Sequence, residues 1–165
     1  MKSCAVNDTF AANVNSAATN PRVSVITYQD SEHRLEVVAL WKEASGPIAR
    51  HNQAGIIIDK KLAVDDLFFA AITEGRVVGT VMAGYDGHRG WIYSVAVALS
   101  HRRRGIGSML VSHAEQVLTK RGCLKINLPI AEGNESVEAF YAKLGYKTEK
   151  RISMGKLIEA NLPPQ

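Results

Sequence analysis

The feature that most constrains the fold of this chain is a short loop, Arg102-Arg103-Arg104-Gly105-Ile106-Gly107-Ser108. Strand-forming residues precede it at 91–99, and an amphipathic helical pattern begins inside it and ends at Gly122. The predicted inward face of that helix holds Ile106, Met109, Leu110, Val117 and Leu118. Because the first N–H groups of a helix have no partner and its macrodipole favours negative charge, the loop predicts an anion site.

The loop differs from the two commonest nucleotide-binding loops. No Gly-Lys-Ser/Thr ends it, as a Walker A sequence requires, and the third glycine of a dinucleotide fingerprint is missing. Gly105 and Gly107 nonetheless allow phosphate to approach the backbone closely. ATP and NAD are therefore disfavoured, and another phosphate-bearing ligand is expected.

The 165 residues are predicted to form one domain over 22–165, preceded by a disordered leader at 1–21. The leader is rich in Ala, Asn, Ser and Thr, lacks an apolar pattern and ends at Asn20-Pro21. No stretch matches a secretory signal or a membrane span. Two cysteines form no disulfide framework, so a reducing cytoplasm is expected.

Periodicity along the chain alternates between strands and helices. Strands are expected at 23–27, 67–72, 77–85, 91–99 and 125–130, and the middle three form an antiparallel meander. Helices are expected at 31–44, with Leu35, Val38 and Trp41 inward, and at 56–62 after a break at Gly46-Pro47. A last helix is expected to follow Asn134 as its N-cap and to end at Gly145 as its C′ residue, with Val137, Phe140, Tyr141 and Leu144 inward. A final hairpin is expected over 146–158. The predicted class is α/β (α+β), a mixed, mostly antiparallel central sheet flanked by helices.

Two segments resemble motifs of the GNAT superfamily of N-acetyltransferases. The sequence from Val95 to Gly107 is similar to motif A, whose pattern Arg/Gln-x-x-Gly-x-Gly/Ala is filled by Arg102, Gly105 and Gly107. The segment 134–146 resembles motif B, and 79–90 is similar to the YpeA-like branch. The resemblance implies a GNAT-like acyl-CoA N-acyltransferase fold and direct transfer of acetyl from acetyl-CoA to a primary amine in a ternary complex.

The resemblance also implies roles for particular residues. Tyr141 matches the general acid, and a backbone N–H near Val95 or Val97 is the expected oxyanion donor. Strand residues 95–97 offer main-chain groups to pantetheine, and Pro129 suits an unpaired strand edge. The implied cofactor-binding residues are Val95, Ala96, Val97, Arg102, Arg103, Arg104, Gly105, Ile106, Gly107, Ser108, Asn134 and Val137.

The general base is not identified by sequence. Asn127 stands where several relatives carry a glutamate, and Asp86, His88, Tyr93 and Glu132 are alternatives. This gap leaves open a catalytically inactive CoA-binding regulatory domain. The short basic run, with no interleaved aromatic residues and a net charge of only +4, gives weak support to a nucleic-acid-binding module. Neither nucleic acid, a membrane nor a metal is expected as a partner; the amine acceptor and the choice between monomer and homodimer stay open.

Overall fold

The computed structural model describes residues 22–44 and 49–161, and its centre is a five-stranded sheet. The strands are β1 (Ser24–Thr27), β2 (Phe68–Thr73), β3 (Arg76–Tyr85), β4 (Gly90–Val97) and β5 (Ile126–Asn127), in the spatial order β1-β2-β3-β4-β5. All neighbours are antiparallel except β4 and β5, which are parallel. The predicted mixed, mostly antiparallel sheet is confirmed. The predicted leader and the Gly46-Pro47 break lie outside the described residues.

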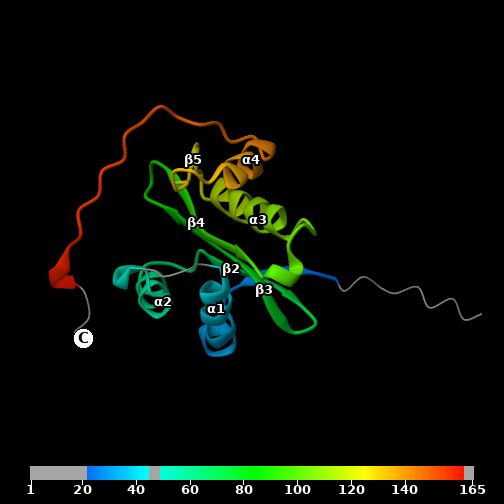
Figure 1. Cartoon of the computed structure of the whole chain (residues 1–165). Helices are drawn as coiled ribbons and strands as arrows, with labels where there is room; N and C mark the ends of the chain where they lie inside the picture. The colour runs from blue at the N-terminus through cyan, green and yellow to red at the C-terminus, as the bar shows by residue number, and fades with distance from the viewer. Residues whose placement is uncertain (1–21, 45–48, 162–165) are drawn as a thin grey trace, which may run out of the picture.

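Helices cover both faces of this sheet (Figure 1). One face carries α1 (Asp30–Ala44) and α2 (Ala54–Leu62), and the other carries α3 (Ile106–Lys120) and α4 (Glu135–Lys143). Short 3₁₀ turns lie at Arg50–Asn52, Leu99–His101 and Glu159–Asn161. Within the described ranges, no helix has both the length and the apolar character that a bilayer crossing needs.

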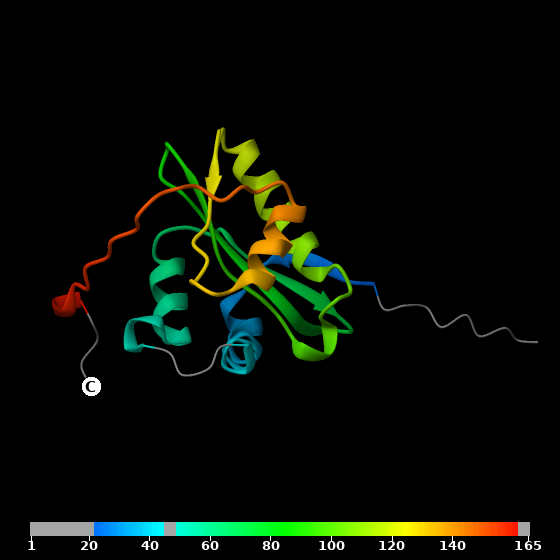
Figure 2. The same ribbon diagram turned by 45° about the horizontal axis from the view of Figure 1, so that its top comes forward.

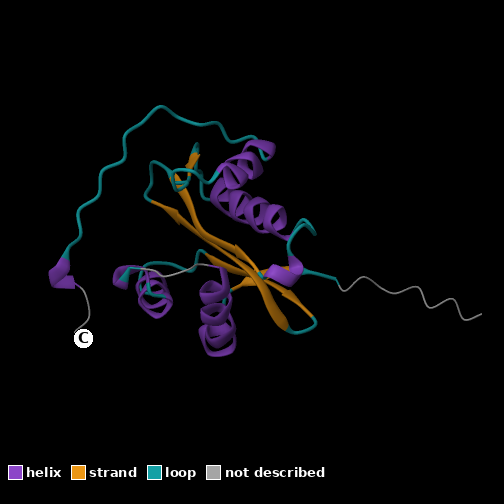
Figure 3. Ribbon diagram, in the orientation of Figure 1, coloured by secondary structure: helices purple, strands orange, loops and turns teal. Residues whose placement is uncertain are grey.

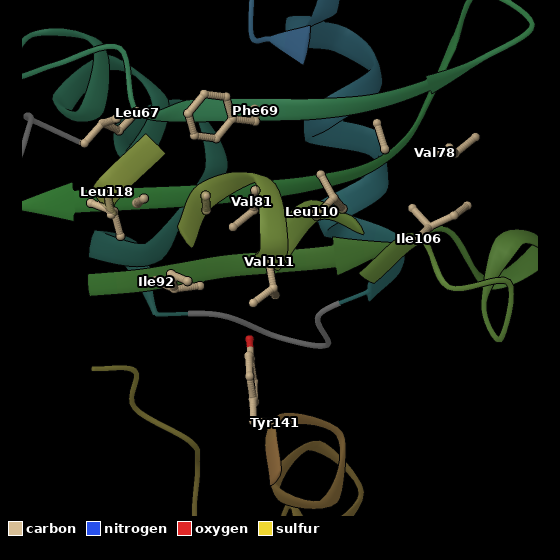
Figure 4. Close-up of a cluster of buried hydrophobic side chains, with 13 residues drawn as sticks. Leu67, Phe69, Val78, Val81, Ile92, Ile106, Leu110, Val111, Leu118 and Tyr141 are labelled. Carbon is tan, nitrogen blue, oxygen red and sulfur yellow. The ribbon is translucent and has the colours of Figure 1, made fainter. Parts of the chain in front are cut away.

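The sheet separates two apolar clusters. Ile106, Leu110, Val111, Ala114 and Leu118 of α3 are buried against the sheet residues of one cluster, shown in Figure 4. The expected α3 face is thus confirmed in outline, but Met109 is 42% exposed and Val111 and Ala114 take the inward places.

The second cluster lies under α1 and α2. There α1 buries His33, Val37, Leu40 and Trp41, whereas Leu35, expected inward, is 85% exposed. The prediction of Leu35 as a core residue was wrong, whereas Trp41 is buried as expected and Val38 packs against the cluster. At about 3.6 residues per turn, Leu35 lies nearly opposite the buried Val37 on α1. Its hydrophobic signal is weak, so several faces fit the sequence pattern comparably.

A β-bulge interrupts the pairing of β3 with β4. Thr80 pairs with Ala96 and Met82 with Tyr93, so Val81 alone faces the two residues Ser94 and Val95. Ser94 has φ +52°, the left-handed region that non-glycine residues rarely adopt. The extra residue reverses the alternation: Ile92, Val95 and Val97 face the α3 cluster, and Tyr93, Ala96 and Ala98 face the α1 cluster.

The final hairpin is absent from residues 146–158. Figure 3 draws no strand there, and Ile152 and Met154 are each 94% exposed. The expected strand at 125–130 is also shorter, with two residues in β5. So short an edge offers few backbone hydrogen bonds to a further strand, and the contact that forms is between side chains, from Lys125 and Asn127 to Glu149.

Candidate functional site

A cavity of about 1160 Å³ follows the open edge of β4. The pairing of β4 with β5 ends at Trp91 and Asn127, and Figure 2 shows the chain after β5 turning toward α4. The rest of β4, from Ile92 to Val97, therefore has no partner in β5, and Ser94 to Val97 line this cavity. Pro129 lies just past β5, where no ladder partner needs an N–H.

The cavity brings together most residues that the sequence assigned to the cofactor. Of that set, Val95, Ala96, Val97, Arg102, Arg103, Gly105, Ile106, Gly107, Ser108, Asn134 and Val137 line it. Arg104 is exposed and lies outside the lining. Segments far apart in the sequence, from β4 to α4, thus line the same cavity.

One end of the cavity has the character of an anion site. Gly105, with φ +79°, precedes α3, and no side chain caps the helix. The first-turn N–H groups are left for a ligand, next to Arg102 and Arg103. A Cβ on Gly107 would lie 3.3 Å from Cζ of Phe140, so a larger residue here would crowd the Phe140 ring. The donors and the space fit a pyrophosphate.

The side chain of Arg102 has a hydrogen-bond partner within the protein. Its Nε donates to the carbonyl oxygen of Val97 at 3.1 Å, which ties the loop to the last residue of β4. The side chain is therefore partly structural, and the backbone of the loop supplies the larger number of donors to the anion site.

A buried hydrogen-bond chain fixes the bulge in the middle of the cavity wall. Nε1 of Trp41 donates to Oγ1 of Thr80 at 2.8 Å, and Thr80 donates to the carbonyl oxygen of Ser94 at 3.2 Å. Thr80 is fully buried, so both bonds are shielded from water. This chain holds β4 in its irregular conformation, next to the backbone groups of Val95.

Helix α4 closes the other wall. Oδ1 of Asn134 accepts from the N–H of Val137 at 3.4 Å, as the predicted N-cap requires, and Phe140 lines the cavity one turn later. Trp41 of α1, Ile57 of α2 and Gln53, the N-cap of α2, are among the residues that complete the lining. Sequence reasoning missed these because no local motif marks them.

Tyr141 does not line the cavity. It is 8% exposed and lies in the α3-side cluster, with ring centroids 4.9 Å from Phe140 and 5.5 Å from Tyr146. Its hydroxyl points toward the buried cluster in Figure 4. Burial raises the pKa of the phenol to about 12, so at neutral pH the group is a proton donor and not a base.

The candidate bases are dispersed. Asp86 and Tyr93 line a second cavity beside α2, whereas His88 and Glu132 line neither cavity. Asn127 donates to Glu149, and its Oδ1 is buried without a partner among the described atoms. No carboxylate lines the β4-edge cavity in the described parts of the chain.

Comparison with sequence families gives a match over most of the chain. The model described as the acetyltransferase (GNAT) family matches residues 29–146. An acetyltransferase of Pectobacterium atrosepticum is 44% identical over 125 residues, 74% of this chain and 88% of that protein. One of Yersinia enterocolitica is 38% identical over 137 residues, covering 82% and 96%.

Solved structures share the fold at lower identity. An aminoglycoside N-acetyltransferase in complex with CoA superposes with a TM-score of 0.70 at 16% identity, covering 86% of this chain and 98% of that one. Glucosamine-6-phosphate N-acetyltransferase from Arabidopsis thaliana gives 0.60 at 21% identity, covering 83% and 99%.

Proposed function

This chain belongs to the GNAT acetyltransferase family, and we propose that it moves acetyl from acetyl-CoA directly to a primary amine while both are bound. Acetyl as the transferred group, direct transfer and membership of the YpeA-like branch are all parts of this proposal. The observation that carries it is the β4-edge cavity, which joins an anion site at α3 to an unpaired strand edge.

The two ends of the cavity suit the two ends of the cofactor. The loop at Arg102–Ser108 offers N–H groups and positive charge to the pyrophosphate. The free edge at Val95–Val97 offers backbone groups to the pantetheine amides, as an added strand would use them. Apolar side chains such as Val137 and Phe140 pack beside the pantetheine arm.

Direct transfer suits a cavity whose described lining holds no thiol to carry the acetyl group. No cysteine lines it among the described residues, and Cys123 lies apart from it. The cavity also reaches α1 and α2, so an amine can approach β4 from the face opposite α3. The amine nitrogen then attacks the thioester carbonyl, the C–N bond forms, and the C–S bond breaks.

Protons and charge are handled by three groups in this proposal. A backbone N–H at Val95 or Val97, next to the pinned bulge, stabilises the oxyanion. Tyr141 gives its proton to the departing thiolate and regains one from solvent, while the proton lost by the amine goes to water. Because Tyr141 does not line the cavity and its hydroxyl points toward the buried cluster (Figure 4), donation requires α4 or the ring to shift when cofactor enters.

The test is a calorimetric titration with acetyl-CoA, with ATP and NAD as controls, followed by thiol release with a panel of amines. Selective micromolar binding and amine-dependent thiol release are expected. Binding without turnover on any amine would favour the inactive CoA-binding domain. No binding would refute the assignment of the cavity.

A further inference from the structure

A second cavity, of about 520 Å³, adjoins the β4-edge cavity. Ile57 of α2 lines both, and β4 runs from one to the other: Trp91 and Tyr93 line the second, and Ser94 to Val97 line the first. A group held in the second cavity therefore lies next along the strand to the bulge. We call it the aromatic cavity.

The lining of the aromatic cavity is largely apolar. It has the rings of Tyr85, Trp91 and Tyr93 together with the aliphatic residues Ile56, Ile57 and Val64. Trp91 is 41% exposed although it belongs to an inner strand of the sheet. Its neighbour Ile92 faces the α3 cluster, so alternation turns Trp91 to the α2 side. Exposed rings beside a hollow of this size are typical of small-molecule sites.

The buried lysine of the aromatic cavity already has a partner. Lys61, only 6% exposed, pairs with Asp65 at 2.5 Å, donates to the carbonyl oxygen of Ala83 and lies 5.5 Å from the Tyr93 ring centroid. The pair leaves neither charge for a ligand. Through the Ala83 carbonyl, Lys61 also ties α2 to β3 beside the cavity.

The remaining charged residues do not form an acidic surface. Oδ1 of Asp86 accepts from the N–H groups of His88 at 2.8 Å and Arg89 at 2.6 Å, and these bonds hold its pKa below the usual range. Lys60 and His51 also line the cavity. A ligand with several positive charges would meet one engaged carboxylate and a lysine, so the lining does not favour a polycation.

We infer that the aromatic cavity binds the body of the acceptor, and that the acceptor is a monoamine with an apolar, ring-sized body and not a polyamine or an aminoglycoside. This inference rests on the proposed function. Stacking on Trp91 and Tyr93 would hold the body while its amine reaches along β4 to the bulge. The preference arises from apolar burial and from the absence of a free acidic patch in the described lining.

Calorimetric titration in the presence of CoA, which cannot acetylate, tests the inference without turnover. The probes are 2-phenylethylamine and spermidine. Wild-type protein should bind 2-phenylethylamine more tightly than spermidine. Trp91→Ala should weaken 2-phenylethylamine binding by about tenfold or more, because a ring contact and its buried area are lost. Trp91→Phe should restore most of the affinity.

Leu35→Ala is the matched control, since Leu35 is an exposed apolar residue on α1 outside both cavities, and it should change nothing. Equal or tighter binding of spermidine, no binding of 2-phenylethylamine, or an unchanged affinity in Trp91→Ala would overturn the inference. The acetyl-CoA titration reports separately on the proposed function. Cofactor binding with turnover of polyamines alone would leave that function standing and remove this acceptor class.

Discussion

Replacing Gly107 by glutamate places a carboxylate in the proposed anion site, and the size of its repulsion of phosphate can be estimated. The new Cβ would lie 3.3 Å from Cζ of Phe140 and 3.9 Å from Cγ2 of Val97, both of which line the cavity. At about 5 Å from a phosphate oxygen, the repulsion amounts to about 1–3 kcal/mol for effective dielectric constants between water and a protein surface. Binding of CoA should therefore weaken by roughly 5- to 150-fold.

Two variants separate charge from bulk in this experiment. Gly107→Ala adds the Cβ without the charge and gains helix propensity of up to about 1 kcal/mol, so any loss of affinity there reports on space alone. Met109→Glu adds the same charge to a residue of α3 that is 42% exposed and outside the cavity lining. Calorimetry gives the Kd for CoA, and circular dichroism checks the fold. Wild-type affinity in folded Gly107→Glu would refute the assignment of phosphate to this loop.

Other residues give independent tests. Tyr141→Phe should keep the Kd for acetyl-CoA and slow thiol release by about 10²- to 10⁴-fold; full activity would remove Tyr141 from the mechanism. The raised pKa of Tyr141 adds stability that is fully present below pH 10 and lost as pH rises toward 12. Over that pH range the free energy of unfolding, measured in urea, should therefore fall less in Tyr141→Phe than in the wild type. Thr80→Val should cost about 1–3 kcal/mol in urea unfolding because the Ser94 carbonyl and an indole N–H lose their partner, with Thr80→Ser as control; an unchanged unfolding midpoint would contradict that role. Gly79→Ala should cost about 1–3 kcal/mol, since its Cβ would lie 2.9 Å from a leucine of α3, whereas Gly55→Ala meets nothing within 4 Å; equal thermal midpoints for these two would argue against tight packing of α3.

Local signals predicted the parts of the fold that depend on neighbouring residues. The meander, the start of α3 at the glycine loop and the Asn134 cap all arise from turn chemistry, periodicity and backbone donors within a few residues. The hairpin prediction at 146–158 was wrong because strand propensity alone provides no partner, and β5 offers an edge of only two residues.

The lining residues from β4, the loop and α4 could be predicted from sequence, but those from α1 and α2 could not. The loop 102–108 and the strand before it carry a contiguous motif, so their contribution to the cavity was accessible from sequence. Trp41 and Ile57 were not, because they reach the cavity through the packing of α1 and α2 on the sheet. The residue spacing correctly predicted that Tyr141 faces inward. It did not predict that the side chain lies outside the cavity lining.

By itself the sequence determined the loop that we propose as the anion site, since free N–H groups at a helix start and the two glycines are properties of one continuous segment. Only the tertiary structure decided where the strand edge opens. The bulge at Ser94 depends on pairing with β3 around Thr80, which is distant in the sequence. Strand β4 separates from β5 where the pairing of Trp91 with Asn127 ends. Backbone register is a relation between strands, and no single segment encodes it.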